Sequence, residues 1–128
     1  MEDLRGELHQ ALTSLRSATG AYARACADLS AAETAHRDAQ ATLEAAEGVQ
    51  RDNAYRSGLP GSNEGARTAA LREIIAQAPG VALARAQAAR CAAAKDSALA
   101  TYRAAEAHAK AERAIVTALT ALVMPSGF

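Results

Sequence analysis

The amino-acid sequence predicts an all-α fold, a long antiparallel helical hairpin (coiled coil) with a short helix at its tip. Three observations lead to this prediction. Alanine, the residue with the highest helix propensity, occurs 37 times among 128 residues. Apolar residues recur at steps of three and four along two long stretches. Between them lies one passage, residues 56–73, that gathers glycines, a proline and three arginines. We therefore expect two long helices that fold back on each other within a single domain, residues 1–128.

The first predicted helix covers residues 3–56 and carries a seam with two kinds of position. One position holds mostly large residues at intervals of seven, from Leu8 to Leu43, and its companion holds Leu4 followed by alanines. This is the heptad pattern of a coiled coil with one large and one small position. Small residues along a whole seam position let two helix axes approach more closely than the usual 8–10 Å.

A connector, residues 57–62, ends the first helix. Gly58 suits the left-handed position that follows a helix C-terminus, and Pro60 prevents the helix from continuing. Asn63 can cap a short helix over residues 63–77. The Ala-Pro-Gly sequence at 78–80 interrupts that helix, because a proline disfavours the helical conformation of the residue before it.

The third predicted helix covers residues 79–123, and residues 124–128 are expected to fray. Its seam runs from Val81 to Val123. Further large apolar residues fall beside the seam, namely Leu83, Leu99, Ile115 and Leu122. This apolar face is wider than a contact between two helices requires. The sequence therefore predicts a homo-oligomer that forms a helical bundle, most simply a dimer with a four-helix core.

Antiparallel pairing of helices of similar length also predicts a register. It places Tyr22 near Glu112. By the same count Cys26 lies opposite His108, about 25 Å along the axis from Cys91. A disulfide bond within one chain is therefore not expected.

Composition narrows the classes of function. Fourteen basic and fourteen acidic residues leave no net charge, and three tyrosines with one phenylalanine offer few rings for base stacking. Both features argue against nucleic-acid binding. The N-terminal MEDLRGELHQ lacks the apolar region of a signal peptide, and no apolar run approaches the ~18 residues of a membrane span. With only two cysteines, the sequence predicts a reduced, cytoplasmic protein.

No residue pattern identifies a catalytic reaction, so we expect a protein that is not an enzyme and holds no cofactor or metal. The sequence GLPGSNEG lacks the Gly-Lys-Ser/Thr of a phosphate loop, and no strand precedes it. A zinc site formed by Cys26, His36 and His108 is disfavoured because these residues fall at different seam phases. The carboxylates of the first helix are those of an ordinary solvated face.

The best candidates for ligand binding lie in and around the connector. They are Arg56, Asn63, Arg67 and Arg72. The three arginines converge on the predicted tip, where the free N–H groups and the dipole of the short helix favour an anion. One interpretation is a site for a phosphate or a carboxylate. The other is that the arginines brace the turn by pairing with neighbouring carboxylates.

The heptapeptide GSNEGAR at 61–67 is followed by Ala-Ala-Leu and by a proline-containing break into a long helix. It resembles the turn of a family of small phage-encoded helical proteins, in which a Gly-Lys-Asn-Ala-Glu-Glu-Arg-like turn joins two coiled-coil arms. Asn63, Glu64 and Arg67 fit this turn, whereas Ser62 stands where the family tends to have Lys, and Gly65–Ala66 departs from the Ala-Glu-Glu of the family. The resemblance covers about residues 21–123. It implies an accessory, non-enzymatic protein, of a kind that commonly acts against host defences.

Three functions follow in order of preference. The first is an oligomeric binding protein that engages and blocks a host protein, as a phage accessory or anti-defence factor in the host cytoplasm. The alternative is a sponge that sequesters a phosphate-bearing nucleotide signal at the arginines, and the third is a nucleic-acid-binding accessory protein. The first two differ in whether the arginines enclose a pocket or lie on an open surface.

Overall fold

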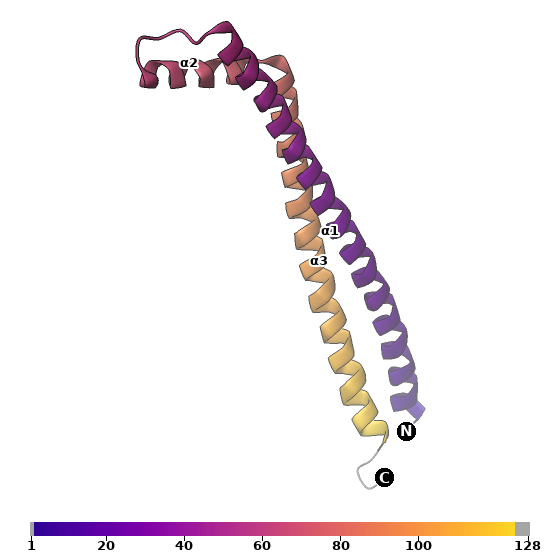
Figure 1. The fold of residues 1–128 in the computed structure, drawn as a ribbon. Helices are drawn as coiled ribbons and strands as arrows, with labels where there is room; N and C mark the ends of the chain where they lie inside the picture. The colour runs from indigo at the N-terminus through magenta and orange to yellow at the C-terminus, as the bar shows by residue number, and fades with distance from the viewer. Residues whose placement is uncertain (1, 125–128) are drawn as a thin grey trace. The chain divides into compact units, whose positions relative to one another are not determined.

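The protein is all-α, as the sequence predicts. The computed structural model describes residues 2–124, which form the helices α1 (Glu2–Ser57), α2 (Glu64–Gln77) and α3 (Pro79–Val123) and no β-strand. Helices α1 and α3 pack against each other in antiparallel orientation, with the short α2 between them in the chain (Figure 1). Residues 125–128 of the predicted tail lie outside the described residues.

The chain divides into two compact units, and each is described by itself. The first unit combines Met1–Ala31 with Asp96–Phe128, and the second unit is Ala32–Lys95. The second unit thus holds the end of α1, all of α2 and the beginning of α3. The expectation of a single domain stays a prediction.

The core of the first unit is a row of alanines. Its buried members are Ala11, Ala18, Ala25 and Ala109. The large residues at the alternate seam position of α1, such as Leu15 and Leu29, are only half-buried. The predicted seam is confirmed, and its small position is the one at the centre of the contact. Short side chains let the two backbones approach, so that methyl groups meet in the middle and the longer leucines lie along the edge.

The second unit has a similarly thin core. Its buried hydrophobic residues are Ala39, Ala54, Ala78, Val81, Ala84 and Ala88. Val81, with 0% of its side chain exposed, is the one buried hydrophobic residue larger than alanine in the described part of the chain. Helix α2 contributes no buried residue. An ion pair of 3.9 Å between Glu47 Oε1 and Arg85 Nη2 links α1 to α3, and its partial exposure makes its contribution to stability small.

A pair of tyrosines joins α1 to α3 in the first unit. The ring centroids of Tyr22 and Tyr102 lie 5.4 Å apart with the ring planes inclined by 34°, and the two hydroxyl oxygens are 3.1 Å apart. The sequence did not predict this contact. The predicted register placed Tyr22 near Glu112, and Tyr22 also lines a small hollow with Ala109 and Arg113, the residue after Glu112. Successive alanines offer nearly equivalent contacts, so the two rings add a specific contact that the seam lacks.

The connector turns on two glycines. Gly58, directly after α1, has a φ of +81°, and Gly61 has a φ of +131°. At Gly61 a Cβ atom would lie 2.9 Å from the Cβ of Ala66 and 3.1 Å from the backbone nitrogen of Arg67. The loop therefore packs against the first turn of α2 so closely that there is no room for a side chain.

The ends of α2 follow the local signals in the sequence. Asn63 is in an extended conformation and caps the helix, since its Oδ1 accepts a hydrogen bond of 2.8 Å from the Ala66 N–H. Ala78 is extended as well, and its N–H donates to the Ile75 carbonyl at 3.3 Å. Pro79 then begins α3, where its missing N–H costs no hydrogen bond. The predicted cap and the predicted break are both present.

We expect opposite effects from two glycine substitutions. Gly61→Ala should lower the free energy of unfolding by about 1–3 kcal/mol, because the new Cβ is strained and meets α2. Gly48→Ala should raise it by roughly 0.5–1 kcal/mol, because Gly48 lies within α1 and a Cβ there meets nothing within 4 Å. Urea denaturation followed by circular dichroism measures both. A Gly61→Ala variant as stable as the wild type would contradict the close packing of the loop.

Candidate binding site

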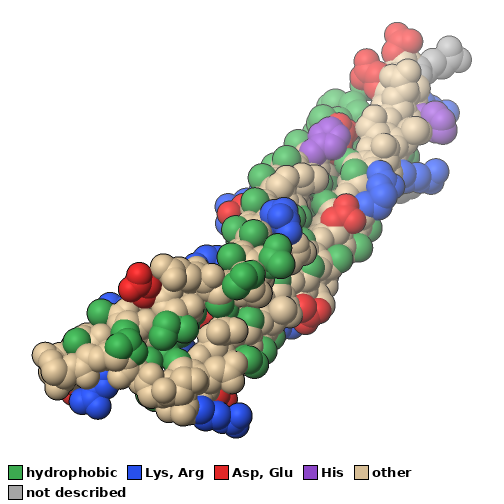
Figure 2. Space-filling model, turned by 90° about the horizontal axis from the view of Figure 1, so that it is seen from above, with side chains coloured by type: hydrophobic (Ala, Val, Ile, Leu, Met, Phe, Trp, Pro, Cys, Tyr) green, Lys and Arg blue, Asp and Glu red, His purple; other side chains and the backbone are tan. Residues whose placement is uncertain are grey.

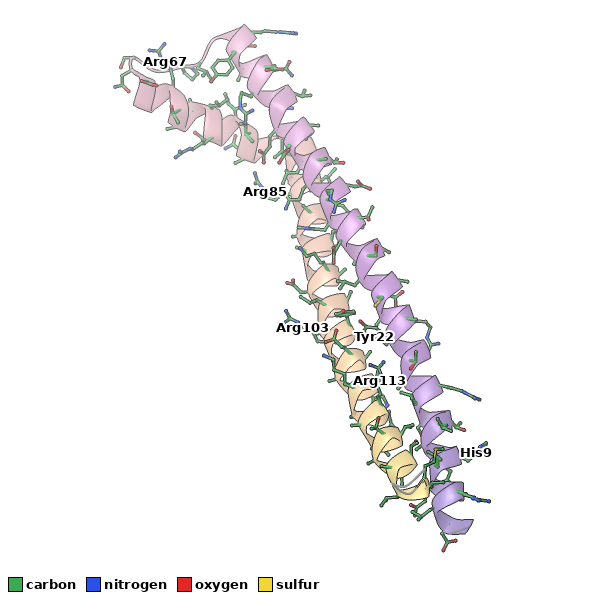
Figure 3. The ribbon with its side chains drawn as sticks, turned by 60° about the horizontal axis from the view of Figure 1, so that its bottom comes forward. His9, Tyr22, Arg67, Arg85, Arg103 and Arg113 are labelled. Atoms are coloured by element: carbon green, nitrogen blue, oxygen red, sulfur yellow. The ribbon has the colours of Figure 1, made fainter. Side chains whose placement is uncertain are left out.

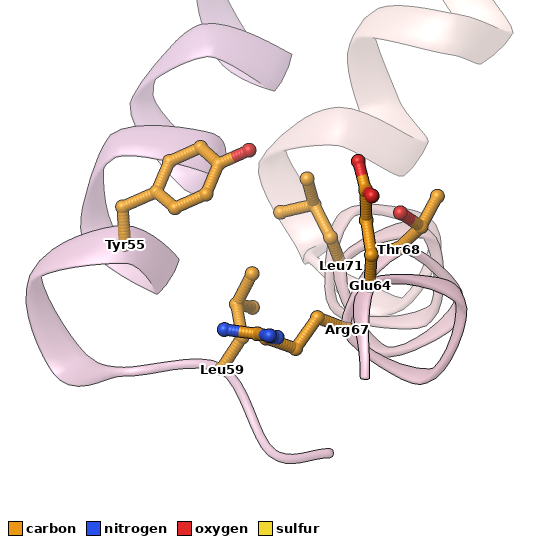
Figure 4. A pocket seen from close by; sticks show the side chains of 6 residues that line it. All are labelled: Tyr55, Leu59, Glu64, Arg67, Thr68 and Leu71. Carbon is orange, nitrogen blue, oxygen red and sulfur yellow. The ribbon is translucent and has the colours of Figure 1, made fainter. Parts of the chain in front are cut away.

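A hollow of about 380 Å³ lies in the second unit, between the end of α1, the connector and α2 (Figure 4). We call it the loop hollow, and its lining residues are Tyr55, Leu59, Glu64, Arg67, Thr68 and Leu71. Half of this lining is apolar or aromatic and half is polar or charged. Such a mixed surface suits a ligand that carries an apolar part and a polar group together.

Local structure explains why these residues meet. Glu64, Arg67, Thr68 and Leu71 are spaced by three, four and seven residues from the first, so they share one face of α2. Tyr55 lies in the final turns of α1, and Leu59 follows Gly58 in the connector. The connector reverses the chain and so brings the end of α1 opposite this face of α2. Tyr55 is 62% exposed, so its aromatic ring remains available for contact with a ligand.

Arg67 is the charged group with spare bonding capacity. Its Nε donates to the backbone carbonyl of Asn63 at 3.4 Å, and this bond fixes the base of the guanidinium group. Its terminal nitrogens form no ion pair with any side chain that the structure describes. Glu64 lines the same hollow, yet the two groups stay more than an ion-pair distance apart. In Figure 4 the guanidinium extends towards Leu59, while the Glu64 carboxylate lies beside Thr68 on α2.

The structure brings together two of the four predicted site residues. Asn63 and Arg67 are in contact, and Arg67 lines the loop hollow. Arg56 is in the last turn of α1 and Arg72 is on α2, and both are exposed without lining the hollow. The three arginines therefore do not form one cluster around this hollow.

Ion-pair bracing of the turn is not seen either. The neighbouring carboxylates are those of Asp52, Glu64 and Glu73. Within residues 3–124, none of them forms an ion pair with an arginine. Glu73 instead accepts a hydrogen bond from Gln77 at 3.3 Å. The turn is held by the Asn63 cap and by the fit of Gly61 against α2.

Sequence reasoning missed five of the lining residues, namely Tyr55, Leu59, Glu64, Thr68 and Leu71. Two signals could have found them. Glu64, Arg67 and Leu71 follow the cap at helical spacing, which puts them on one face. Tyr55 is one of three tyrosines in the chain and lies within a turn of the predicted helix end, where an exposed aromatic ring is uncommon.

A second polar cluster lies in the first unit. A small hollow of about 90 Å³ is lined by Tyr22, Glu106, Ala109, Lys110 and Arg113. Figure 3 labels Tyr22 on α1 and Arg113 on α3. Lys110 Nζ lies 3.2 Å from Glu106 Oε1. This hollow is too small for most ligands, and its carboxylate already has a cation as its partner.

Hydrogen bonds within this cluster shift two pKa values. The hydrogen bond with Tyr22, and then the neighbouring Glu106, raise the pKa of the Tyr102 hydroxyl above its ordinary value. Lys110, and then Tyr102, lower the pKa of the Glu106 carboxyl below its ordinary value. Glu106 thus interacts with both Lys110 and the tyrosine pair.

Other kinds of site were sought in the described residues. No three His, Cys, Asp or Glu side chains gather there in a way that could hold a metal ion. Cys26 and Cys91 are free thiols, each half-buried. None of the helices has a stretch long and apolar enough to cross a membrane, as far as the described residues extend.

Comparison with known proteins adds no relative. No family model, no curated protein and no solved structure matches this chain. The resemblance to small phage-encoded helical proteins therefore depends on the turn at 61–67 and its surroundings. The all-helical, three-helix fold is shown by the structure.

The free energy of unfolding should distinguish the helix-capping role of Asn63 from the role of Arg67. Asn63→Ala removes the side-chain oxygen that accepts from Ala66, and we expect it to cost about 1 kcal/mol of the free energy of unfolding. Arg67→Ala removes one long hydrogen bond at the surface and should change that free energy by less than about 0.5 kcal/mol. Thermal unfolding followed by circular dichroism compares them. A large loss of stability in Arg67→Ala would assign this side chain to bracing the turn.

The stability of the first unit should fall at acid pH because Glu106 becomes protonated. Its pKa is lowered in the folded chain, so its contribution to stability is complete above the ordinary carboxylate range, about pH 4–5, and is lost as the pH falls below it. Glu106→Gln should therefore melt below the wild type near neutral pH, and the difference should shrink on acidification. Melting temperatures between pH 7 and pH 3 test this. A difference that is constant with pH would contradict the assignment.

Proposed function

We propose that this chain is a non-enzymatic binding protein and that the loop hollow binds a segment of a protein partner. In this proposal an apolar side chain of the partner packs on Tyr55, Leu59 and Leu71, while an adjacent carboxylate pairs with Arg67. The observation that carries the proposal is the unpaired guanidinium of Arg67 beside the exposed ring of Tyr55. Tyrosine and arginine are also the residue types that dominate binding energy at protein interfaces.

Helix α2 gives independent support for a partner. It is 14 residues long and has no buried residue. Helices of this length are marginal in water unless they pack on something. Its apolar residues Leu71 and Ile75 are only half-buried, and Ile74 is exposed. A partner that covered this helix would remove those side chains from water and stabilise α2 as well.

The lining of the hollow favours a polypeptide over a nucleotide. A phosphate group is usually held by several cationic or N–H donors, whereas the loop hollow offers one guanidinium. Glu64, which shares the hollow, repels the double charge of a phosphate more strongly than the single charge of a carboxylate. Arg56 and Arg72 lie outside the hollow, so the sponge for a nucleotide signal has less support. Nucleic-acid binding has no support beyond scattered arginines in a chain without net charge.

The identity of the partner is a further hypothesis. That it is a host protein, and that the chain is a phage accessory or anti-defence factor of the host cytoplasm, follows from the resemblance of the turn at 61–67. The chemistry of the hollow supports only the narrower statement of an apolar residue next to an acidic one.

A displayed peptide library tests the site without knowledge of the partner. Peptides selected on the wild-type chain should carry an apolar residue adjacent to Asp, Glu or a free C-terminus. Arg67→Ala should weaken their binding roughly ten- to hundredfold, the equivalent of one charged hydrogen bond. Arg72→Ala is the matched control, because it removes an exposed arginine of the same helix that does not line the hollow. Equal losses in both variants, or selected peptides without an acidic group, would contradict the proposal.

A thermal-shift screen with linear and cyclic nucleotides tests the alternative. A ligand at 100 times its Kd adds about 2.7 kcal/mol to the stability of the folded state, which is easily detected in a domain of this size. We expect no such shift. A shift that is present in the wild type and absent in Arg67→Ala would replace the protein partner with a phosphate-bearing small molecule.

A further inference from the structure

Two of the three tyrosines in the chain meet across α1 and α3, in a position suited to a reaction between them. The hydroxyl oxygens of Tyr22 and Tyr102 are 3.1 Å apart, the ring centroids are 5.4 Å apart, and the ring planes are inclined by 34°. In a phenol the two ortho carbons flank the carbon that bears the hydroxyl. Two hydroxyls in contact therefore bring an ortho carbon of each ring close to the other ring.

Both rings can be reached from solvent. Tyr22 and Tyr102 are each half-buried, because two packed helices cannot enclose a ring on all sides. Hydrophobic side chains accordingly reach the surface over the face of the molecule that Figure 2 shows. A small hollow of about 90 Å³ also lies beside Tyr22. An oxidant in solution can therefore take an electron from one ring while the other ring stays in contact with it.

A carboxylate beside the pair can accept the proton that a phenol releases when it is oxidised. Glu106 follows Tyr102 by one helical turn on α3, so the two side chains are neighbours. Tyr22, and then Glu106, raise the pKa of the Tyr102 hydroxyl, which therefore keeps its proton until an electron is removed. Lys110 Nζ lies 3.2 Å from Glu106 Oε1 and lowers the pKa of that carboxyl, so Glu106 is ionised and can serve as the base.

We infer that Tyr22 and Tyr102 form an oxidative modification site, at which a peroxidase with hydrogen peroxide joins the two rings by a carbon–carbon bond. Each phenol gives up one electron and its hydroxyl proton, and the two phenoxyl radicals couple through their ortho carbons. The hydrogen on each of those carbons is then lost as the hydroxyl forms again. The net loss of two electrons and two protons reduces one hydrogen peroxide to two water molecules. The site belongs to the first unit, so this inference is independent of the loop hollow and of the proposed function.

Joining the two rings would connect α1 and α3 of the first unit covalently. The buried hydrophobic residues of this unit are alanines, and each of them contributes little to stability. The cross-link would connect residues that are 80 positions apart in the chain. A link across so long a loop stabilises a fold mainly by restricting the unfolded chain, as a disulfide bond does. Oxidation would therefore convert a weak contact between two helices into a permanent one.

Controlled oxidation of the full chain tests the site. Cys26 and Cys91 are replaced by alanine in every chain, because thiols reduce phenoxyl radicals. A haem peroxidase with limiting hydrogen peroxide, at micromolar protein, should give a monomer that shows the fluorescence of dityrosine. Mass spectrometry of its tryptic peptides should find the peptide of Tyr22 joined to that of Tyr102, with the loss of two hydrogen atoms. The product should melt about 10 °C or more above the untreated chain.

Single substitutions assign the reaction to this pair. Tyr22→Phe and Tyr102→Phe each keep a ring but lose the oxidisable phenol, so each should lower the yield of the dityrosine monomer at least about tenfold, because no second phenol is then held in place. Tyr55→Phe is the matched control, since Tyr55 is 62% exposed and lies in the second unit, and it should leave the yield unchanged.

Circular dichroism checks that each variant folds, and the peptide map of the parent chain decides the question even where a variant does not. Dityrosine that appears only in covalent dimers would overturn the inference, because the two rings would then have reacted between chains. A monomeric product that is lost in Tyr55→Phe and kept in Tyr22→Phe would overturn it as well.

Discussion

The contact between alanines at the small position of the heptad is the constraint on which this structure depends. Nine of the ten buried hydrophobic residues in the described part of the chain are alanines, and Val81 is the tenth. An alanine removes little area from water, and at roughly 25 cal/mol per Å² each contact stabilises the hairpin only slightly. The helices therefore depend on their length and on the high helix propensity of alanine more than on a core. Close approach of the backbones leaves the leucines at the edges, partly exposed. The alanines at the small position of the seam therefore have a second effect, because the leucines beside them stay partly exposed and form an apolar surface.

The sequence predicts those features that a few neighbouring residues decide. Gly58, Asn63 and Pro79 each act through their own backbone or an adjacent turn, so the connector, the cap and the break are where the sequence places them. Register is different, because it depends on which alanines of two distant segments meet, and one alanine resembles the next. The contact between Tyr22 and Tyr102 was not predicted, because a row of repeating alanines does not single out one partner for a given residue.

The candidate site divides in the same way. Asn63 and Arg67 belong to one helical turn and were both predicted, since a capping residue and the arginine four positions later must be neighbours. Tyr55, Leu59 and Leu71 meet Arg67 through the path of the connector, which depends on the positive φ of Gly58 and on the fit of Gly61 against α2. Arg56 and Arg72 were grouped with Arg67 by their nearness in the sequence. Their positions on two helices direct them away from the hollow, because residues on one helix share a face only at spacings of three, four or seven, and Arg67 and Arg72 are five apart.

The loop hollow follows from the same shortage of buried area, because the helix α2 that forms one side of it has no buried residue. The loop hollow combines a ring, two leucines, a carboxylate and a guanidinium, and the Asn63 carbonyl holds that guanidinium at its base. Such a surface discriminates among ligands, because a partner without an acidic group leaves Arg67 unpaired beside apolar side chains. The loop beside the hollow leaves no room for a Cβ at Gly61, and Asn63 caps the adjacent helix. The two glycines with positive φ, Gly58 and Gly61, are thus both at the connector, where they bring an aromatic ring, leucines and charged groups together.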